Sequence, residues 1–118
     1  MDFESKDSRY SHLCVLLVDD NATNLLIAGR LIAKFGAEAV SVDSGADAVQ
    51  ASMQRPFDVI FMDCMMPEMD GYEATGIIRD PKSGSKNSDT PIIALTANVM
   101  EGDREKCLES GMNDYVAK

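Results

Sequence analysis

The chain has 118 residues, enough for a single hydrophobic core, and we therefore expect one compact unit. Hydrophobic residues make up 45% and charged residues 26%, as in ordinary globular proteins, which argues against a wholly disordered chain. The formal net charge of −9 argues against nucleic acid as a partner, because phosphate backbones are bound through clustered lysines and arginines. No apolar run approaches the roughly 18 residues that cross a bilayer, and no signal peptide is evident. We expect a cytoplasmic chain without membrane contact.

The first residues are polar and carry no hydrophobic period, so we expect residues 1–12 to be a linker or tag remnant and residues 13–118 to form the domain. His12, the only histidine, directly precedes a strand pattern, and we assign it no function. Cys14, Cys64 and Cys107 lack CxxC spacing, which favours free thiols over a disulfide framework or a zinc site.

Five short apolar runs follow along the chain, and each predicts a β-strand. They are Cys14–Val18 and residues 39–42, 59–62, 92–95 and 115–117. The first, third and fourth are apolar throughout, as are strands buried on both faces of a parallel sheet. These three runs are expected to form the central strands.

Four helical patterns alternate with the strands. The first places five apolar residues on one face, namely Leu25, Ala28, Leu31, Ile32 and Phe35. Gly36 then suits a left-handed C-terminal stop, as does Gly111 after the fourth pattern at residues 99–108. The second and third patterns cover residues 46–53 and 72–78. The polar run 80–89 has no apolar anchor and predicts a flexible loop, to which we assign no chemistry.

This alternation predicts an α/β fold with a doubly wound, five-stranded parallel sheet. Right-handed crossovers leave few topologies, and the flavodoxin-like order 2-1-3-4-5 is the commonest at this size. A ligand site is expected beyond the carboxyl ends of the strands, where the direction of winding changes.

Polar residues stand directly after four of the five strands. They are Asp19 and Asp20, Asp63, Thr96 and Lys118, in chain order. Each alone is an ordinary loop or cap residue, but parallel strands bring all five to one edge of the sheet. The three carboxylates repel one another by about 4 kcal/mol per pair at roughly 4 Å, for an effective dielectric near 20. A hard cation relieves this repulsion, and Mg²⁺ prefers such oxygen ligands.

These residue types also suit phosphoryl transfer, which needs a nucleophile in line and positive charge on the transferred oxygens. Asp63 is the candidate nucleophile and would form an acyl phosphate. Mg²⁺ on Asp20 and Asp63 would neutralise one side of the group and Lys118 the other, while the Thr96 hydroxyl donates a hydrogen bond.

Three motifs resemble the response-regulator receiver domain, and most closely the receivers of hybrid histidine kinases. They are Val-Leu-Leu-Val-Asp-Asp-Asn at 15–21, Met-Asp-Cys-Met-Met-Pro-Glu-Met-Asp-Gly at 62–71 and Ile-Ile-Ala-Leu-Thr-Ala-Asn at 92–98. The resemblance covers about residues 13–118. It implies phosphorelay signalling, with phosphate received on an aspartate from a phosphohistidine of a histidine kinase or a histidine phosphotransfer protein.

The resemblance also assigns roles to the site residues. Asp63 is the implied phosphoacceptor, Asp20 a direct metal ligand, Asp19 a ligand largely through water, and the Met65 backbone carbonyl a further ligand. Thr96 and Lys118 match the switch hydroxyl and the phosphate-binding lysine, and Tyr115 matches the rotating aromatic. In two-state terms, phosphate on Asp63 draws Thr96 inward, Tyr115 fills the vacated space, and a protein-interaction surface changes.

One departure from the family concerns the fifth helix, which is missing from this chain because the chain stops at Lys118. We expect apolar strand surface to be exposed, with a homodimer through the uncovered sheet face as one outcome. A second departure is Met65, which is polar in many relatives and is expected to tune dephosphorylation.

Two other functions remain open from the residues. One is a phosphohydrolase that acts through an aspartyl phosphate; haloacid-dehalogenase-like phosphatases use such a nucleophile, but they place a second Asp two residues after it as general acid, where this chain has Met65. A binding module that signals without phosphate would lack some of the five site residues, and all are present. We expect the isolated domain not to be an enzyme beyond slow self-dephosphorylation, within a parent that could be a hybrid histidine kinase.

Overall fold

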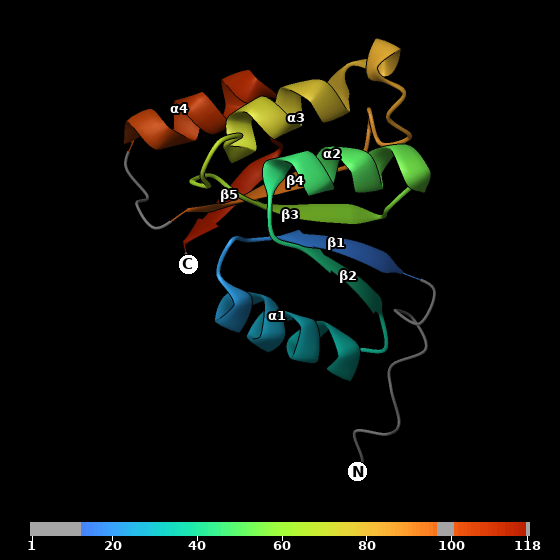
Figure 1. Ribbon diagram of the computed structural model, residues 1–118. Helices are drawn as coiled ribbons and strands as arrows, with labels where there is room; N and C mark the ends of the chain where they lie inside the picture. The colour runs from blue at the N-terminus through green and yellow to red at the C-terminus, as the bar shows by residue number, and fades with distance from the viewer. Residues whose placement is uncertain (1–12, 97–100, 118) are drawn as a thin grey trace.

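The protein is described here by a computed structural model that covers residues 13–96 and 101–117, with the backbone alone at 101–103 (Figure 1). Its strands are β1 (Cys14–Val18), β2 (Glu38–Val42), β3 (Val59–Asp63), β4 (Ile92–Thr96) and β5 (Asp114–Ala117). All pairs are parallel, in the order β2-β1-β3-β4-β5. The predicted doubly wound, flavodoxin-like sheet is confirmed.

Four α-helices connect the strands: α1 (Ala22–Lys34), α2 (Gly45–Gln54), α3 (Gly71–Arg79) and α4 (Glu101–Ser110). The first three begin at Asn21, Ser44 and Asp70, whose side chains each accept the backbone N–H three residues later. Beyond the ends of α1 and α4, Gly36 and Gly111 have φ of 88° and 106°. The left-handed glycine stops predicted from the sequence are therefore confirmed.

The main core lies on the face of the sheet that α2, α3 and α4 cover, whereas α1 lies on the other face (Figure 1). Strand residues on the core side include Leu16, Ile60, Met62, Ile92 and Ala94, all of them buried. The helices contribute small or medium side chains, including Ala48, Ala74, Ile78 and Cys107. The small residues let three helices lie close to the sheet, as dense packing requires.

The other face is only partly covered, which agrees with the expectation of exposed apolar strand surface and corrects the expectation that β3 and β4 are buried on both faces. β1 is buried throughout, but β3 and β4 alternate between buried and half-buried residues. The half-buried side chains are those on the face of α1, namely Val59, Phe61, Ile93 and Leu95. Among the described residues, α1 is the one helix on this face, and it contacts β1 and β2 (Figure 1). Within the described residues, the apolar runs of β3 and β4 are therefore fully covered on one face only.

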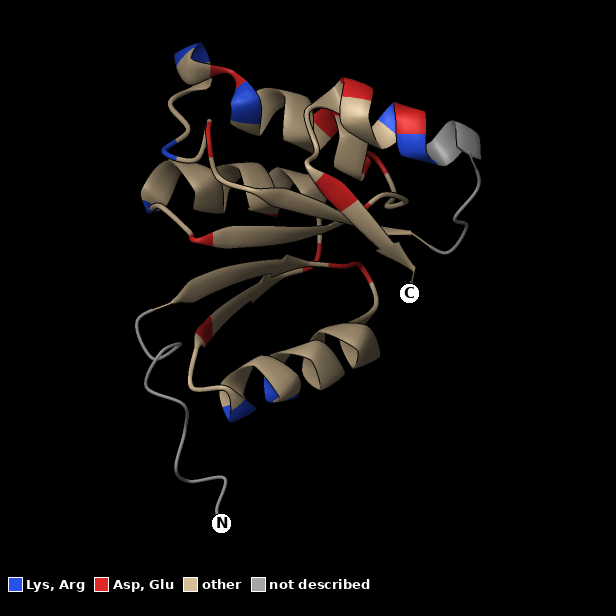
Figure 2. Cartoon of the chain, turned by 180° about the vertical axis from the view of Figure 1, so that it is seen from behind, with Lys and Arg blue, Asp and Glu red and all other residues tan. Residues whose placement is uncertain are grey.

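Helix α1 also departs from the predicted pattern, because none of its residues is buried. Leu25, Ala28 and Ile32 are half-buried against the sheet, but Leu31 and the following Phe35 are 52% and 58% exposed. Figure 2 shows no acidic residue on this helix. The hydrophobic period therefore predicted the helix correctly, but fewer of its apolar side chains are covered than the pattern indicated.

The segment between α3 and β4 has a polar anchor, contrary to the expectation of an unanchored loop. It forms a short 3₁₀ helix, η2 (Pro81–Ser83), and then buries Asn87. The Asn87 Oδ1 accepts the Phe57 N–H at 2.7 Å, and its Nδ2 donates to the carbonyls of Ser52 and Arg55, both at 2.9 Å. A hydrophobic pattern cannot reveal such an anchor, because the residue is polar.

Two further expectations can be compared with the described part of the chain. Cys14, Cys64 and Cys107 are free and buried, as expected. No helix in the described ranges is both long and apolar enough to cross a membrane. The proposed linker at 1–12, His12, Ala97 and Lys118 lie outside the described residues.

Candidate functional site at the carboxyl edge of the sheet

Three carboxylates meet at the carboxyl edge of β1 and β3. Asp19 and Asp20 follow β1, and Asp63 is the last residue of β3. One oxygen atom from each lies within 4.8 Å of the others. Asp19 and Asp63 are 3% and 1% exposed, whereas Asp20 is exposed to solvent. Two of the three carboxylates are thus buried, and the cluster is open to solvent at Asp20.

The beginning of α1 orients Asp19. Its Oδ1 accepts the backbone N–H of Asn21 at 2.9 Å, and its Oδ2 accepts Nδ2 of Asn24 at 3.3 Å. Asn21 in turn caps α1 through the N–H of Asn24 at 3.1 Å. Asn24 was not predicted to support the site, because a polar residue in the first turn of a helix looks like ordinary surface.

The loop after β3 surrounds Asp63. Its Oδ1 accepts the backbone N–H of Met65 at 3.3 Å. The N–H of Gly71 donates to the Cys64 carbonyl at 3.0 Å, closing the loop where α3 begins. A Cβ at Gly71 would stand 2.2 Å from the Asp63 carbonyl oxygen, so only glycine fits there. Gly71 is therefore a structural requirement of the site that the sequence analysis did not single out.

Thr96 and Tyr115 lie on the two strands beyond β3. Thr96 ends β4, is buried, and directly follows Leu95, which pairs with Asp63. Tyr115 on β5 pairs with Ala94 on β4, so Tyr115 projects from the same face of the sheet as Ala94 and Thr96. Its half-buried ring packs against the core. The two residues of the predicted switch thus occupy one face of neighbouring strands.

Two sulfur-containing residues, Cys64 and Met65, directly follow Asp63. Burial, partly offset by a hydrogen bond from Tyr72, raises the pKa of the Cys64 thiol to about 11. A thiol with this pKa stays protonated at neutral pH and does not compete as a nucleophile. Met65 is 72% exposed, so its side chain stands at the open rim of the site.

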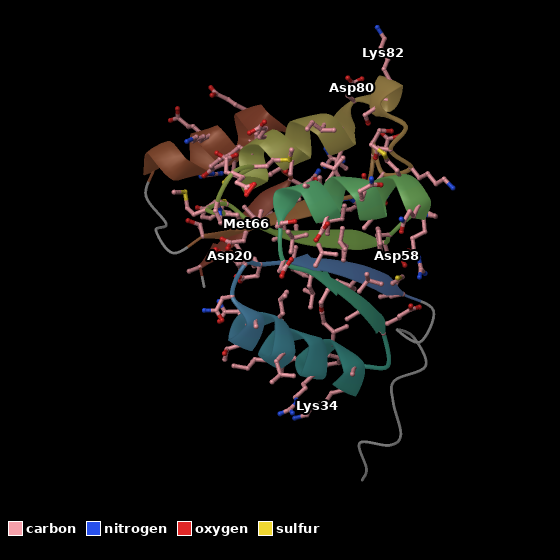
Figure 3. All side chains as sticks on the ribbon, viewed as in Figure 1. Asp20, Lys34, Asp58, Met66, Asp80 and Lys82 are labelled. Atoms are coloured by element: carbon pink, nitrogen blue, oxygen red, sulfur yellow. The ribbon has the colours of Figure 1, made fainter. Side chains whose placement is uncertain are left out.

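The donor set fits a hard divalent cation. Carboxylate oxygens from Asp19, Asp20 and Asp63 already lie close together, and the exposed side at Asp20 leaves room for water and a phosphoryl group. Figure 3 places Asp20 at the end of the sheet opposite Asp58 and Asp80. Asp80, at the start of the 80–89 segment, is therefore remote from the cluster.

Comparison with known proteins agrees with this geometry. The response regulator receiver domain family matches residues 15–118. The chain is 46% identical over 104 residues to the sensor protein GacS of Pseudomonas syringae, covering 88% of this chain and 12% of GacS. It therefore spans about an eighth of the length of that relative.

Two solved structures are similar in fold and sequence. The receiver domain of the sensor histidine kinase PA1611 from Pseudomonas aeruginosa, with magnesium coordinated in its active-site cleft, matches with a TM-score of 0.79 and 43% identity, covering 90% of this chain and 84% of that one. The Saccharomyces cerevisiae Ssk1 receiver domain, co-crystallised with the phosphotransfer protein Ypd1, has a TM-score of 0.84 and 33% identity, with coverage of 92% and 80%. The chain thus belongs to the response regulator receiver domain family.

Proposed function

We propose that this chain is a phosphoacceptor switch of a two-component phosphorelay, with Asp63 as the residue that receives the phosphoryl group. The observation that carries the proposal is the convergence of Asp19, Asp20 and Asp63 within 4.8 Å at the carboxyl edge of the sheet. Membership of the receiver family supports it independently. The donor is a phosphohistidine on a histidine kinase or a histidine phosphotransfer protein, as the Ssk1–Ypd1 complex suggests by analogy.

The cation that suits this site is Mg²⁺, which Asp20, Asp63 and the Met65 backbone carbonyl would hold directly and Asp19 largely through water. When bound, it supplies positive charge to the phosphoryl oxygens. Support comes from the oxygen donor set and from the magnesium of the PA1611 receiver. Asn24 and the N–H of Asn21 hold Asp19 in the orientation that the site needs.

The acceptor step uses a carboxylate oxygen of Asp63. This oxygen forms a bond to phosphorus while the phosphorus–nitrogen bond of the donor breaks, and its electron pair returns to the imidazole. The Met65 N–H donates to Asp63 Oδ1 and fixes the carboxylate orientation. Thr96 and Lys118 complete the proposed site, the hydroxyl and the ammonium each contacting a phosphoryl oxygen.

The proposed readout runs through β4 and β5. Thr96 moves toward the phosphoryl group, and Tyr115, on the same face of the next strand, turns into the space that opens. Because Tyr115 packs against the core beside α4, its movement changes the surface around α4 and β5. The surface around α4 and β5 then exists in two conformations, which differ in their affinity for a partner protein.

The domain acts as a substrate of phosphotransfer and hydrolyses its own acyl phosphate slowly, rather than turning over external esters. The parent is proposed to be a hybrid histidine kinase, in line with GacS. Exclusion of nucleic acid and a cytoplasmic location remain predictions of the sequence.

Association of two copies through the uncovered sheet face is a further part of the proposal. A cavity of about 370 Å³ lies there between α1 and the sheet, with Ile27 and Leu31 on one wall and Leu95 on the other. Ile27, Leu31 and Val116 are each about half exposed. Light scattering over a wide concentration range tests this part, and a monomer throughout would refute it.

Beryllofluoride, a phosphoryl mimic, tests the acceptor proposal. In Mg²⁺, the amide resonances of Thr96 and Tyr115 should shift on addition of beryllofluoride, and Asp63→Asn should abolish the shift. Equal responses of both proteins would instead favour a binding module that works without phosphate.

A further inference from the structure

Gly45, the first residue of α2, makes an unusually close contact with the loop that follows Asp63. A Cβ built at Gly45 would lie 2.6 Å from the Met69 carbonyl oxygen and 3.0 Å from both Cβ and Cγ of Met69. The first distance is well inside van der Waals contact, so no side chain fits unless something moves. Gly45 is buried, and its φ is not in the left-handed region. The requirement for glycine is one of space.

The loop that Gly45 contacts is a compact turn joining β3 to α3. The Met69 N–H donates to the Pro67 carbonyl at 2.8 Å, and Glu68 between them has a left-handed φ of 68°. The Gly71 N–H donates to the Cys64 carbonyl at 3.0 Å. Because these hydrogen bonds join residues within the loop to one another, a displacement of Met69 would displace the whole turn.

Helix α2 is the less movable partner in this contact. Ala48 and Ser52 on its inner face are fully buried, and the Ser44 side chain caps its first turn by accepting the Asp47 N–H at 3.1 Å. Displacing the helix would disturb the core, where interiors are densely packed. The loop is therefore the element that would yield to a side chain at position 45.

On the site side, the same loop carries Met65. Its N–H donates to Asp63 Oδ1 at 3.3 Å, and its carbonyl is a proposed cation ligand. Two glycines therefore allow close contacts at this loop: Gly71 lies against the Asp63 carbonyl, and Gly45 lies against Met69.

We propose that Gly45 is a positioning residue for the cation site, because its missing side chain lets the 64–70 loop settle against α2 and so fixes the Met65 carbonyl relative to Asp63. This inference rests on the proposed function for the identity of the ligand. Gly45 touches neither the cation nor the carboxylates, and it acts through Met69 and the loop.

The effect can be separated from ordinary helix propensity. Replacing glycine by alanine within a helix normally stabilises the helix, because alanine is the better helix former. Gly76 on α3 and Gly29 on α1 provide matched controls, since an added Cβ at either would meet no atom within 4 Å. A side chain at these positions changes propensity without pressing on the loop.

The experiment compares Gly45→Ala with Gly76→Ala and the unaltered chain. Mg²⁺ dissociation constants are measured by titration calorimetry below the unfolding transition, and backbone amide shifts are recorded without metal. Gly45→Ala should raise the dissociation constant by about tenfold or more, as expected for loss of support to a metal ligand, while Gly76→Ala stays within about twofold of the unaltered chain. The amide shifts of Gly45→Ala should centre on residues 64–70.

A Gly45→Ala dissociation constant equal to that of Gly76→Ala, or amide shifts confined to α2, would overturn the inference and leave the proposed function intact. Failure of the unaltered chain to bind Mg²⁺ would count against the proposed function instead. If Gly45→Ala does not fold, the double variant Gly45→Ala/Met69→Gly relieves the contacts with Cβ and Cγ and lets the residue 69 carbonyl turn away. It should fold and bind Mg²⁺ as well as Met69→Gly alone, and weaker binding by the double variant than by Met69→Gly alone would contradict the account.

Discussion

Replacing Asp20 by asparagine removes one charge from the carboxylate cluster while keeping the shape of the side chain. Because carboxylate oxygens of the three aspartates lie within 4.8 Å of one another, the charges of Asp19 and Asp63 both repel Asp20. At that separation, Coulomb's law gives about 3.5 kcal/mol per pair for an effective dielectric of 20 and about 0.9 kcal/mol for water. Asp20 is exposed, so the lower figure is appropriate.

The expected gain in the free energy of unfolding of metal-free Asp20→Asn is therefore about 1–2 kcal/mol. Mg²⁺ should reverse the ranking at high concentration. At a concentration about one hundred times its dissociation constant, a ligand stabilises the native state by about 2.7 kcal/mol, and the variant should lose most of this gain because it lacks a charged ligand.

Urea unfolding with and without Mg²⁺ measures both effects in one series. Glu105→Gln, at an exposed carboxylate on α4, is the control for loss of a negative charge elsewhere. The reasoning is refuted if Asp20→Asn has the same metal-free stability as Glu105→Gln and also keeps the full Mg²⁺ response.

Three further predictions concern the elements that support the site and the fold. Asn87→Ala should lower the free energy of unfolding by about 2–4 kcal/mol in urea denaturation, because it leaves the Phe57 N–H and the Arg55 carbonyl without their partner and removes one of two donors to the Ser52 carbonyl; a loss below about 0.5 kcal/mol would contradict the anchor. Arg79→Lys should lower the free energy of unfolding by about 1–3 kcal/mol. The guanidinium contacts several backbone carbonyls and the Asn113 side-chain oxygen, and an ammonium cannot reach all of them. An unchanged midpoint of thermal unfolding would contradict this prediction. Gly71→Ala should lower the yield of phosphorylated protein after incubation with acetyl phosphate, measured by intact mass, because the added Cβ would displace the Asp63 backbone. A yield equal to that of the unaltered chain would contradict this prediction.

The sequence predicted well those features that depend on chain direction and local period. Strand limits come within one residue, because apolar runs bounded by Asp, Gly and Pro leave little freedom. The meeting of Asp19, Asp20 and Asp63 follows from parallel strands whose carboxyl ends share an edge. Neither inference needs knowledge of side-chain packing.

The errors arise where tertiary contacts override the local pattern. The apolar runs alone did not reveal the half-exposure of β3 and β4, because such a run looks the same whether one face or two are covered; the exposed strand surface was expected only from the comparison with the receiver family. Asn87 looked like a loop residue, although a polar side chain can anchor a segment through buried hydrogen bonds. Gly45 resembled an ordinary helix start, since its close contact is with a residue 24 positions away in the chain.

The central claim, that Asp63 accepts a phosphoryl group with the help of a divalent cation, is tested most directly by intact mass spectrometry after incubation with acetyl phosphate. The account predicts one added phosphoryl group in Mg²⁺, its loss on treatment with hydroxylamine as for an acyl phosphate, and none in EDTA or in Asp63→Asn. A phosphoryl adduct of the same yield in Asp63→Asn, or no adduct on the unaltered chain in Mg²⁺, would contradict it.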